Sequence, residues 1–381
     1  AMEAEPDREL RARTIWAYGR SVQGNPDRQV LRQALQDTSP VVVRQALEVL
    51  LGCDAAHLEG LEEAVARSLG SEDHVVRQLA VKVASRMTNE SFRQIGEVAR
   101  KTGWSEALQM ARAFVDRGYV SHAYAWRDIG LAAIQRHDEP EVLLTATLLI
   151  QHALGGFGDS PVHAPVFDGY LARLPLPAEQ ESLQVLAEEL EKLYPTGEAI
   201  LDWELARLIA MISPTRPKLL EQLLARIQPE SNPIDDLHHL ICLACLPVER
   251  TAAQSERIAQ ALLNLFPKLE SSQATIDRNW EPRVSEMYRK LVEYDPTLPG
   301  RLVDHELFGQ ADHVLFVRPL QGEIRQRAVQ RFLARVEQGQ LELTPALVSM
   351  LAGQTDDQSL LLARGCLADE VLAPTALLVL A

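Results

Sequence analysis

A three-residue phrase that returns at a fixed interval constrains this fold more than any other feature. Val43-Arg44-Gln45 recurs 33 residues later as Val76-Arg77-Gln78. Arg11 lies 33 residues before Arg44, and a related segment appears late as Ile324-Arg325-Gln326-Arg327-Ala328-Val329. Each arginine follows a short polar opening and precedes an apolar stretch. Such a period is typical of stacked repeats, because one helix pair cannot bury its apolar face without its neighbours.

Helical periodicity, interrupted by short turn signals, runs along the chain and predicts an all-α protein. Strand-like alternation of β-branched residues is nearly absent. Near the start, the predicted helices cover residues 6–21, 28–36, 41–51, 57–69 and 71–87, and another begins at Thr88. The low aromatic content, 5%, means that the core depends mainly on Leu, Ala, Val and Ile.

The segment Asp37-x-Ser39-Pro40-x-x-Val43-Arg44-x-Ala46-x-x-x-Leu50 carries a resemblance to a known repeat. It is similar to the second-helix consensus of HEAT repeats. That resemblance implies a capping residue, a proline near the helix start and an arginine that can form a ladder with neighbouring repeats. It also implies one α-α superhelix, a solenoid of antiparallel helix pairs, over residues 6–381. The match is regular at 6–104 and 321–367 and irregular at 105–320.

Several phrases in the middle of the chain carry a second resemblance. They are Asn232-Pro233-Ile234-Asp235-Asp236-Leu237-His238-His239, Asp277-Arg278-Asn279-Trp280 and Leu307-Phe308-Gly309-Gln310-Ala311-Asp312-His313. They resemble the helical segment of large exported bacterial proteins, in which a dehydrogenase-like propeller comes first and a c-type haem domain last. This chain has no Cys-x-x-Cys-His haem motif and no propeller-like strand rhythm. The resemblance therefore implies a connecting segment that holds none of that family's catalytic residues.

Two expectations concern the limits of the chain and its compartment. We expect residues 1–5, where an alanine precedes the methionine, to be a disordered cloning remnant, and the chain to be a segment of a longer protein. The second resemblance implies a periplasmic or exported location. A cytoplasmic location is the alternative, because the chain carries no targeting signal of its own.

The charge of the chain disfavours nucleic acid as a partner. The formal net charge is −15, with −3 in residues 1–150 and −12 in residues 151–381. Nucleic-acid binders usually carry a basic stripe, because contacts to phosphate supply most of their affinity. We therefore expect a neutral or basic protein partner, unless the charge serves only solubility. No apolar run of about 18 residues occurs, so no membrane insertion is expected.

The best candidate for a metal site is the set His238, Cys242 and Cys245. The three positions share one face of a helix, and imidazole and thiolate are ligands that zinc prefers. Asp235 is placed to orient His238. The alternative is an apolar core helix, in which the cysteines pack as small hydrophobic residues. A further reading treats the paired acids and histidines as an acid/base cluster, whereas Asn232 and Pro233 favour an ordinary helix start.

Trp280 and Arg283 are the candidate interaction residues, since Trp and Arg are common anchors at protein interfaces. The alternative is that Trp280 fills a packing gap between helices and that Arg283 forms an intramolecular ion pair. The other four tryptophans are predicted to lie in the core. They are Trp16, Trp104, Trp126 and Trp203.

The function predicted from these features is a non-catalytic interaction scaffold without a cofactor, belonging to a larger redox protein. Its partners would be proteins, among them neighbouring domains of the same chain. One alternative is an enzyme on a HEAT-like fold, such as a DNA-alkylation glycosylase, which needs a basic DNA-binding face. The other is a helical metal binder that uses His238, Cys242 and Cys245.

Overall fold

A computed structural model describes residues 7–22, 26–118, 123–136, 138–155, 166–173, 180–354 and 356–381. The expectation for residues 1–5 lies outside these residues. Every regular element in the described part is a helix, which confirms the all-α prediction. The chain forms two compact units. The first unit comprises Ala1–Phe157, Arg173–Pro177 and Glu198–Glu204, and the second comprises Gly158–Ala172, Ala178–Gly197 and Leu205–Ala381.

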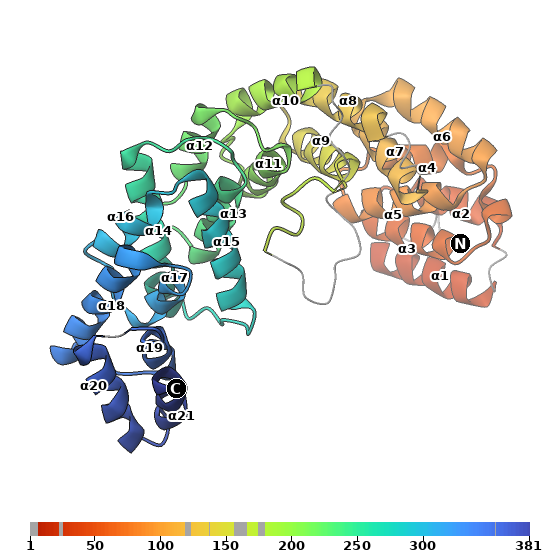
Figure 1. Cartoon of the computed structure of the whole chain (residues 1–381). Helices are drawn as coiled ribbons and strands as arrows, with labels where there is room; N and C mark the ends of the chain where they lie inside the picture. The colour runs from red at the N-terminus through yellow and green to blue at the C-terminus, as the bar shows by residue number, and fades with distance from the viewer. Residues whose placement is uncertain are drawn as a thin grey trace. The chain divides into compact units, whose positions relative to one another are not determined.

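The first unit is built from two layers of helices (Figure 1). In the odd layer, α1, α3, α5, α7 and α9 pack in that order, and in the even layer α2 packs on α4 and α4 on α6. This order agrees with the stacked pairs that the 33-residue period predicts. The helices are α1 (Arg8–Ser21), α2 (Arg28–Leu35), α3 (Pro40–Leu51), α4 (Glu62–Leu69), α5 (His74–Arg86), α6 (Asn89–Thr102), α7 (Trp104–Asp116), α8 (Ala123–Ile134) and α9 (Pro140–Ala153).

Three of the repeated arginines connect helices of the odd layer. Arg11 Nε donates to Asp37 Oδ2 at 2.8 Å, just before α3 begins. Arg44 binds Asp73, which also accepts hydrogen bonds from the first backbone N–H groups of α5. Arg77 forms an ion pair with Glu141 of α9 at 3.0 Å. Arg11, Arg44 and Arg77 thus each contact an acidic residue at or near the start of a later helix in the layer.

One predicted helix is interrupted. The pattern at 57–69 predicts a single helix, but a short 3-10 helix, Ala55–Leu58, precedes α4 and is separated from it by Gly60. Gly60 has a φ of +83°, which a residue with a Cβ adopts only at a cost. The break allows Leu58 and Leu61, on either side of the glycine, to be buried together in the core.

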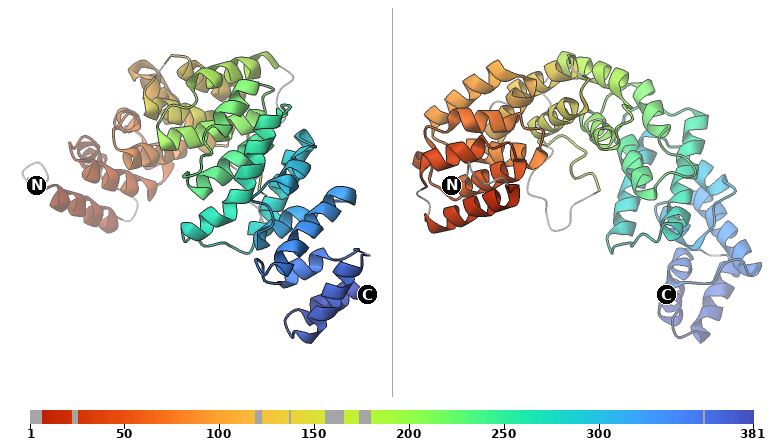
Figure 2. Two further views of the ribbon diagram at one scale, coloured as in Figure 1. Left: turned by 90° about the vertical axis from the view of Figure 1, so that its left-hand side faces the viewer. Right: turned by 180° about the vertical axis from the view of Figure 1, so that it is seen from behind.

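The second unit also contains two layers (Figure 2). In one, α12, α14, α16 and α18 pack in order, and in the other α13, α15, α17, α19 and α21 do so. The helices are α10 (Gln180–Leu193), α11 (Ala199–Ile212, whose first residues belong to the first unit), α12 (Pro217–Leu224), α13 (Pro233–Ala244), α14 (Ala252–Ser271), α15 (Trp280–Tyr294), α16 (Leu298–Asp304), α17 (Val314–Val317), α18 (Gly322–Glu337), α19 (Pro345–Met350), α20 (Asp357–Gly365) and α21 (Ala373–Leu380).

The helices of the second unit differ in length far more than those of the first. They range from 20 residues in α14 to four in α17. No helix in the described part is long and apolar enough to cross a membrane. The prediction of one continuous solenoid over 6–381 stays a prediction, because the chain divides into two compact units.

Candidate functional site

An apolar groove of about 770 Å³ opens in the first unit between α6 and α7, beside Ile129 of α8. This volume lies within the range of about 300–1,000 Å³ that is usual for binding sites. Positions 92, 93, 96, 97, 100 and 101 of α6 line it. They recur with the spacing of one helix face, so the groove follows α6 for about 14 Å, at 1.5 Å per residue.

Small residues create the hollow. Gly96 of α6 and Ala107 and Ala111 of α7 line the groove at positions where larger side chains would fill it. A methyl group added at Gly96 would meet only Met110, with its nearest atom, Cε, at 3.6 Å. This is ordinary van der Waals contact, so the space beside Gly96 is open. Gly96 has no left-handed backbone conformation that would itself require glycine.

Aromatic side chains form the apolar walls. The rings of Phe92 and Phe114 meet edge to face, with their centroids 4.6 Å apart. The guanidinium of Arg117 lies 4.3 Å from the centroid of the Phe92 ring and holds that ring from another side. Trp104, the first residue of α7, is half-buried, and the guanidinium of Arg136 lies 5.7 Å from its ring centroid.

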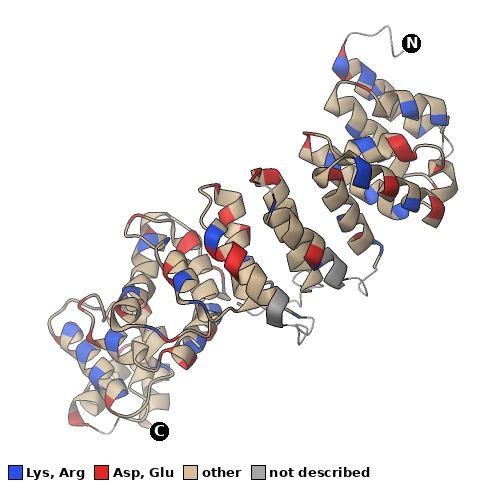
Figure 3. Ribbon diagram, turned by 90° about the horizontal axis from the view of Figure 1, so that it is seen from above, with Lys and Arg blue, Asp and Glu red and all other residues tan. Residues whose placement is uncertain are grey.

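Cations predominate at the groove. Arg93, Arg100 and Lys101 line it, against a single acid, Glu97. Arg93 is occupied, because it forms ion pairs with Glu90 at 2.6 Å and with Glu97 at 2.5 Å. Arg100 and Lys101 are exposed, and neither forms an ion pair with another described residue. Lys and Arg are otherwise interspersed with Asp and Glu (Figure 3), so a local excess of cations stands out in a chain of net charge −15.

The groove lies where the even layer is interrupted. α6 packs on α4 and on α7, and the next even helix, α8, packs chiefly on α9 (Figure 1). Among the described residues, α6 and α8 are not closely packed against each other, although α2 and α4, and α4 and α6, are. The apolar faces of α6 and α7 are therefore left partly uncovered at this point.

The metal candidates from the sequence lie inside α13 and its C-cap. His238 and Cys245 are each 2% exposed, and Cys242 is 0% exposed. His238 Nε2 lies 3.9 Å from Cys242 Sγ, and its Nδ1 is 2.9 Å from the Tyr170 hydroxyl. Burial raises the pKa of the Cys245 thiol to about 12, so this thiol is protonated at neutral pH. No group of three or more His, Cys, Asp or Glu among the described residues is arranged to hold a metal ion.

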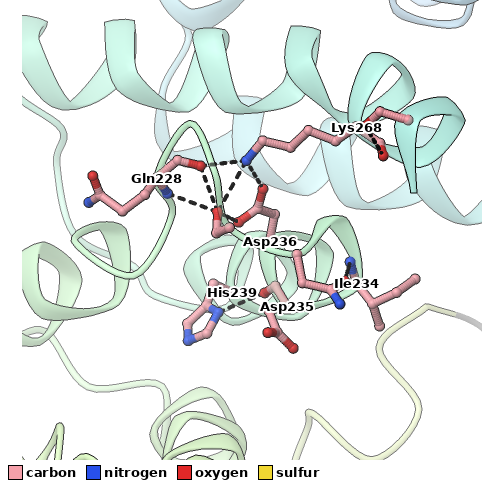
Figure 4. A network of polar contacts seen from close by, with 9 residues as sticks. Gln228, Ile234, Asp235, Asp236, His239 and Lys268 are labelled. Atoms are coloured by element: carbon pink, nitrogen blue, oxygen red, sulfur yellow. Dashed lines mark hydrogen bonds and ion pairs between the residues drawn. The ribbon is translucent and has the colours of Figure 1, made fainter.

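Asp236 and His239 take part in hydrogen bonds and an ion pair within the protein (Figure 4). Asp236 is 1% exposed and forms an ion pair with Lys268 of α14 at 2.5 Å. Its other oxygen accepts a hydrogen bond from the Ser231 hydroxyl. His239 Nδ1 donates to the Asp235 carbonyl at 2.6 Å and its Nε2 lies 3.0 Å from the Tyr194 hydroxyl, which leaves it no free nitrogen for proton transfer. Burial lowers its pKa.

The start of α13 has the geometry of an ordinary helix N-terminus. The Asn232 side chain accepts a hydrogen bond from the Ile234 N–H at 2.9 Å, and Pro233 occupies the first turn. The acids at 235 and 236 lie in that first turn, where the helix dipole favours negative charge. An ordinary helix start therefore explains the positions of Asp235 and Asp236 without an acid/base role.

The candidate interaction residues lie at the start of α15. Trp280 is only 9% exposed, and its ring packs edge to face on Phe266 with the centroids 5.8 Å apart. The Arg283 side chain is 41% exposed and reaches Asp277 at 3.8 Å. In this conformation the indole offers little surface to a partner. An interaction role for the two residues stays a prediction.

The prediction of four core tryptophans was wrong for Trp16, which is 56% exposed. Trp104 and Trp203 are half-buried, and the side chain of Trp126 lies outside the described residues. Sequence reasoning also missed the groove as a site. The signal that was present is the spacing of Trp104, Ala107, Ala111 and Phe114 along one face of α7, but this pattern does not distinguish a covered face from an open one.

Comparisons with known proteins show no family. No protein-family model matches the chain, and no curated protein matches it. A crystal structure of an engineered protein from the Northeast Structural Genomics Consortium is similar over 100% of this chain and 96% of its own, at 13% identity and a TM-score of 0.41. The class is therefore defined by this structure alone: an all-α chain of stacked helices with an open apolar groove.

Proposed function

We propose that the chain is a non-catalytic scaffold that binds a segment of a partner protein in the groove between α6 and α7. The observation that carries this proposal is the groove itself, which combines apolar walls with two exposed cations, Arg100 and Lys101. Apolar area supplies affinity, and charges at the rim steer and select the partner. The buried, hydrogen-bonded state of the histidines in α13 also favours binding over chemistry.

The proposal extends to the setting of the scaffold. The stacked helix pairs and the arginine–aspartate contacts support a HEAT-like repeat. In keeping with the middle-chain resemblance, we place the segment in a larger exported redox protein, where it holds neighbouring domains or a separate protein. The full-length coding sequence checks this part, since it should contain a propeller before the segment and a Cys-x-x-Cys-His motif after it.

A photo-crosslinking amino acid placed at Ala107 tests the groove directly, because this position lies in the groove wall. We expect it to capture a polypeptide, which mass spectrometry then identifies. The same crosslinker at Lys82, an exposed position on α5, should not capture that polypeptide. Binding of the purified partner is then measured by calorimetry against the unmodified chain.

Gly96→Leu should weaken binding of that partner at least tenfold, because the leucine side chain occupies the open space next to Met110. Gly96→Ala is the matched control: it removes the same glycine, should stabilise the helix by about 0.5–1 kcal/mol, and leaves most of the groove open. Unchanged affinity in the leucine variant, with its fold verified by circular dichroism, would show that the groove is not the docking site.

A further inference from the structure

The position of the groove in the stack indicates the shape of its occupant. α4 covers one side of α6 in the even layer, while α8, which would cover the other, packs chiefly on α9. The uncovered strip runs along two helices, α6 and α7, that are joined by Gly103 alone. A strip bounded by helices, with small residues at Gly96 and Ala107, leaves room for the side chains of another helix to pack between those of α6 and α7.

The dimensions fit a short helix. The lining of α6 extends from Phe92 to Lys101, which corresponds to about 14 Å or two and a half turns. An amphipathic helix binds such a groove through apolar residues spaced at i, i+3, i+4 and i+7. An extended peptide that binds by adding a strand gains affinity mainly from main-chain hydrogen bonds to a sheet edge. The described part of this chain contains only helices and offers no such edge.

The cations at the groove indicate the charge of the side chains that flank the apolar face of the bound helix. Arg100 and Lys101 lie at one end of the groove without an ion-pair partner among the described residues, and Arg136 lies beside Trp104. Glu97 is already engaged by Arg93. Carboxylates on the occupant would pair with the first two cations, whereas a basic helix would place like charges against them.

We infer that the occupant is an acidic amphipathic α-helix of a partner protein, which takes the even-layer position left uncovered between α6 and α8. This inference rests on the proposed function and adds the conformation and the charge of the bound segment. It differs from the sequence-based expectation of a neutral or basic partner, because the local charge at the groove is opposite to the net charge of the chain.

Three labelled peptides test the inference by fluorescence anisotropy with the full chain. The first is a 16-residue amphipathic helix with Leu at the core-facing positions and Glu on its flanks. The second carries Lys in place of every Glu, and the third carries a central Pro that breaks the helix. We expect the acidic helix to bind at least tenfold more tightly than either of the others, and Gly96→Leu to remove this binding.

Arg100→Glu combined with Lys101→Glu should reverse the preference, so that the lysine peptide binds more tightly than the acidic one. Both positions are exposed, and circular dichroism verifies the fold of the variant. Salt supplies a second readout. If long-range repulsion between the chain, with its net charge of −15, and the acidic peptide dominates, the affinity should rise as salt is added. If local ion pairs at the groove dominate, as we infer, the affinity should fall as salt is added.

Each contrary result has a separate meaning. Equal binding of the acidic and lysine peptides would overturn the charge assignment, and equal binding of the proline peptide would overturn the helical conformation. If none of the three peptides binds while Gly96→Leu still weakens binding of the purified partner, the inference fails and the proposed function stands. If Gly96→Leu changes neither the peptides nor the partner, the proposed function fails as well.

Discussion

His313 shows how a single buried side chain in the second unit links stability to pH. It is 0% exposed, and its Nδ1 accepts hydrogen bonds from the backbone N–H groups of Gly309 and Gln310 at 3.2 and 3.3 Å. Its Nε2 lies 3.0 Å from the Leu263 carbonyl and donates to it. Both ring nitrogens are thus committed in the neutral state, and a second proton on Nδ1 would oppose two N–H donors. Burial lowers the pKa of His313 to about 4.

The free energy of unfolding should therefore fall as the pH is lowered from about 6.5, the usual histidine pKa, towards about 4. Because the folded pKa is the lower one, the unfolded chain binds the extra proton, and stability is fully present only above pH 6.5. We expect a loss of about 2 kcal/mol from His313 between pH 7.5 and pH 5. Urea unfolding at both values measures it.

The variant for comparison is His313→Gln, which should be less stable than the parent chain at pH 7.5. Between pH 7.5 and pH 5, its free energy of unfolding should fall by about 2 kcal/mol less than that of the parent chain. His239 and His152, whose pKa values are also lowered by burial, remain in both proteins, so the difference isolates His313. His74→Gln, which makes the same replacement at an exposed position, is the control for the substitution itself. Identical pH dependence in His313→Gln would contradict this account.

Contacts between elements explain why the arginines recur. Arg11 is 14% and Asp37 11% exposed, so their ion pair is screened less than a surface pair. The hydrogen bond from Arg11 is the main cause that lowers the pKa of Asp37. Asp37 Oδ1 also accepts the Ser39 N–H at 2.8 Å, which organises the start of α3. One arginine in α1 thereby positions the N-terminus of the next helix in its layer.

A double-mutant cycle with Arg11→Met and Asp37→Asn should give a coupling energy of about 1–2 kcal/mol, because the ion pair is bidentate and largely buried. Asn keeps an oxygen for the Ser39 N–H, so the cycle isolates the contact with Arg11. The exposed pair Arg67 and Glu63, at 55% and 74% exposure, is the control and should couple by less than about 0.5 kcal/mol. Equal coupling in both pairs would contradict the assigned role.

At the scale of the whole molecule, the chain divides into two compact units, so we expect a destabilising substitution to act mainly within its own unit. Leu47 of α3 lies in the first unit and Leu262 of α14 in the second, and both are 0% exposed. In stacked helices each element depends mainly on its neighbours, so stability is distributed locally. A cavity in one unit should therefore loosen that unit first.

Leu47→Ala should destabilise the first unit by about 2–5 kcal/mol, as is usual for a buried leucine. Hydrogen exchange should then accelerate in α1–α5 and remain unchanged in α13–α16. Leu262→Ala is the reciprocal control and should produce the opposite pattern. Equal acceleration in both units after either substitution would show that the chain unfolds as one cooperative body.

Local patterns were sufficient for much of the fold. The periodicity predicted the first helices to within a few residues, because an apolar stripe and its capping residues act over one or two turns. Asp73 and Thr88 cap α5 and α6 at the positions where the sequence indicates helix starts. The merged prediction over 57–69 failed at Gly60, since a left-handed glycine changes the chain direction without altering the apolar spacing.

The sequence by itself determined the helical class, the pairing of helices at a 33-residue period and the positions of the arginines. Only the tertiary structure decided which apolar faces are covered. Trp280 is buried against Phe266, whereas Trp16 remains exposed. Among the described residues, the groove lies where α8 packs chiefly on α9 and is not closely packed on α6. Whether an apolar helix face is buried depends on where helices distant in the sequence pack. Helical periodicity indicates only that the face is apolar.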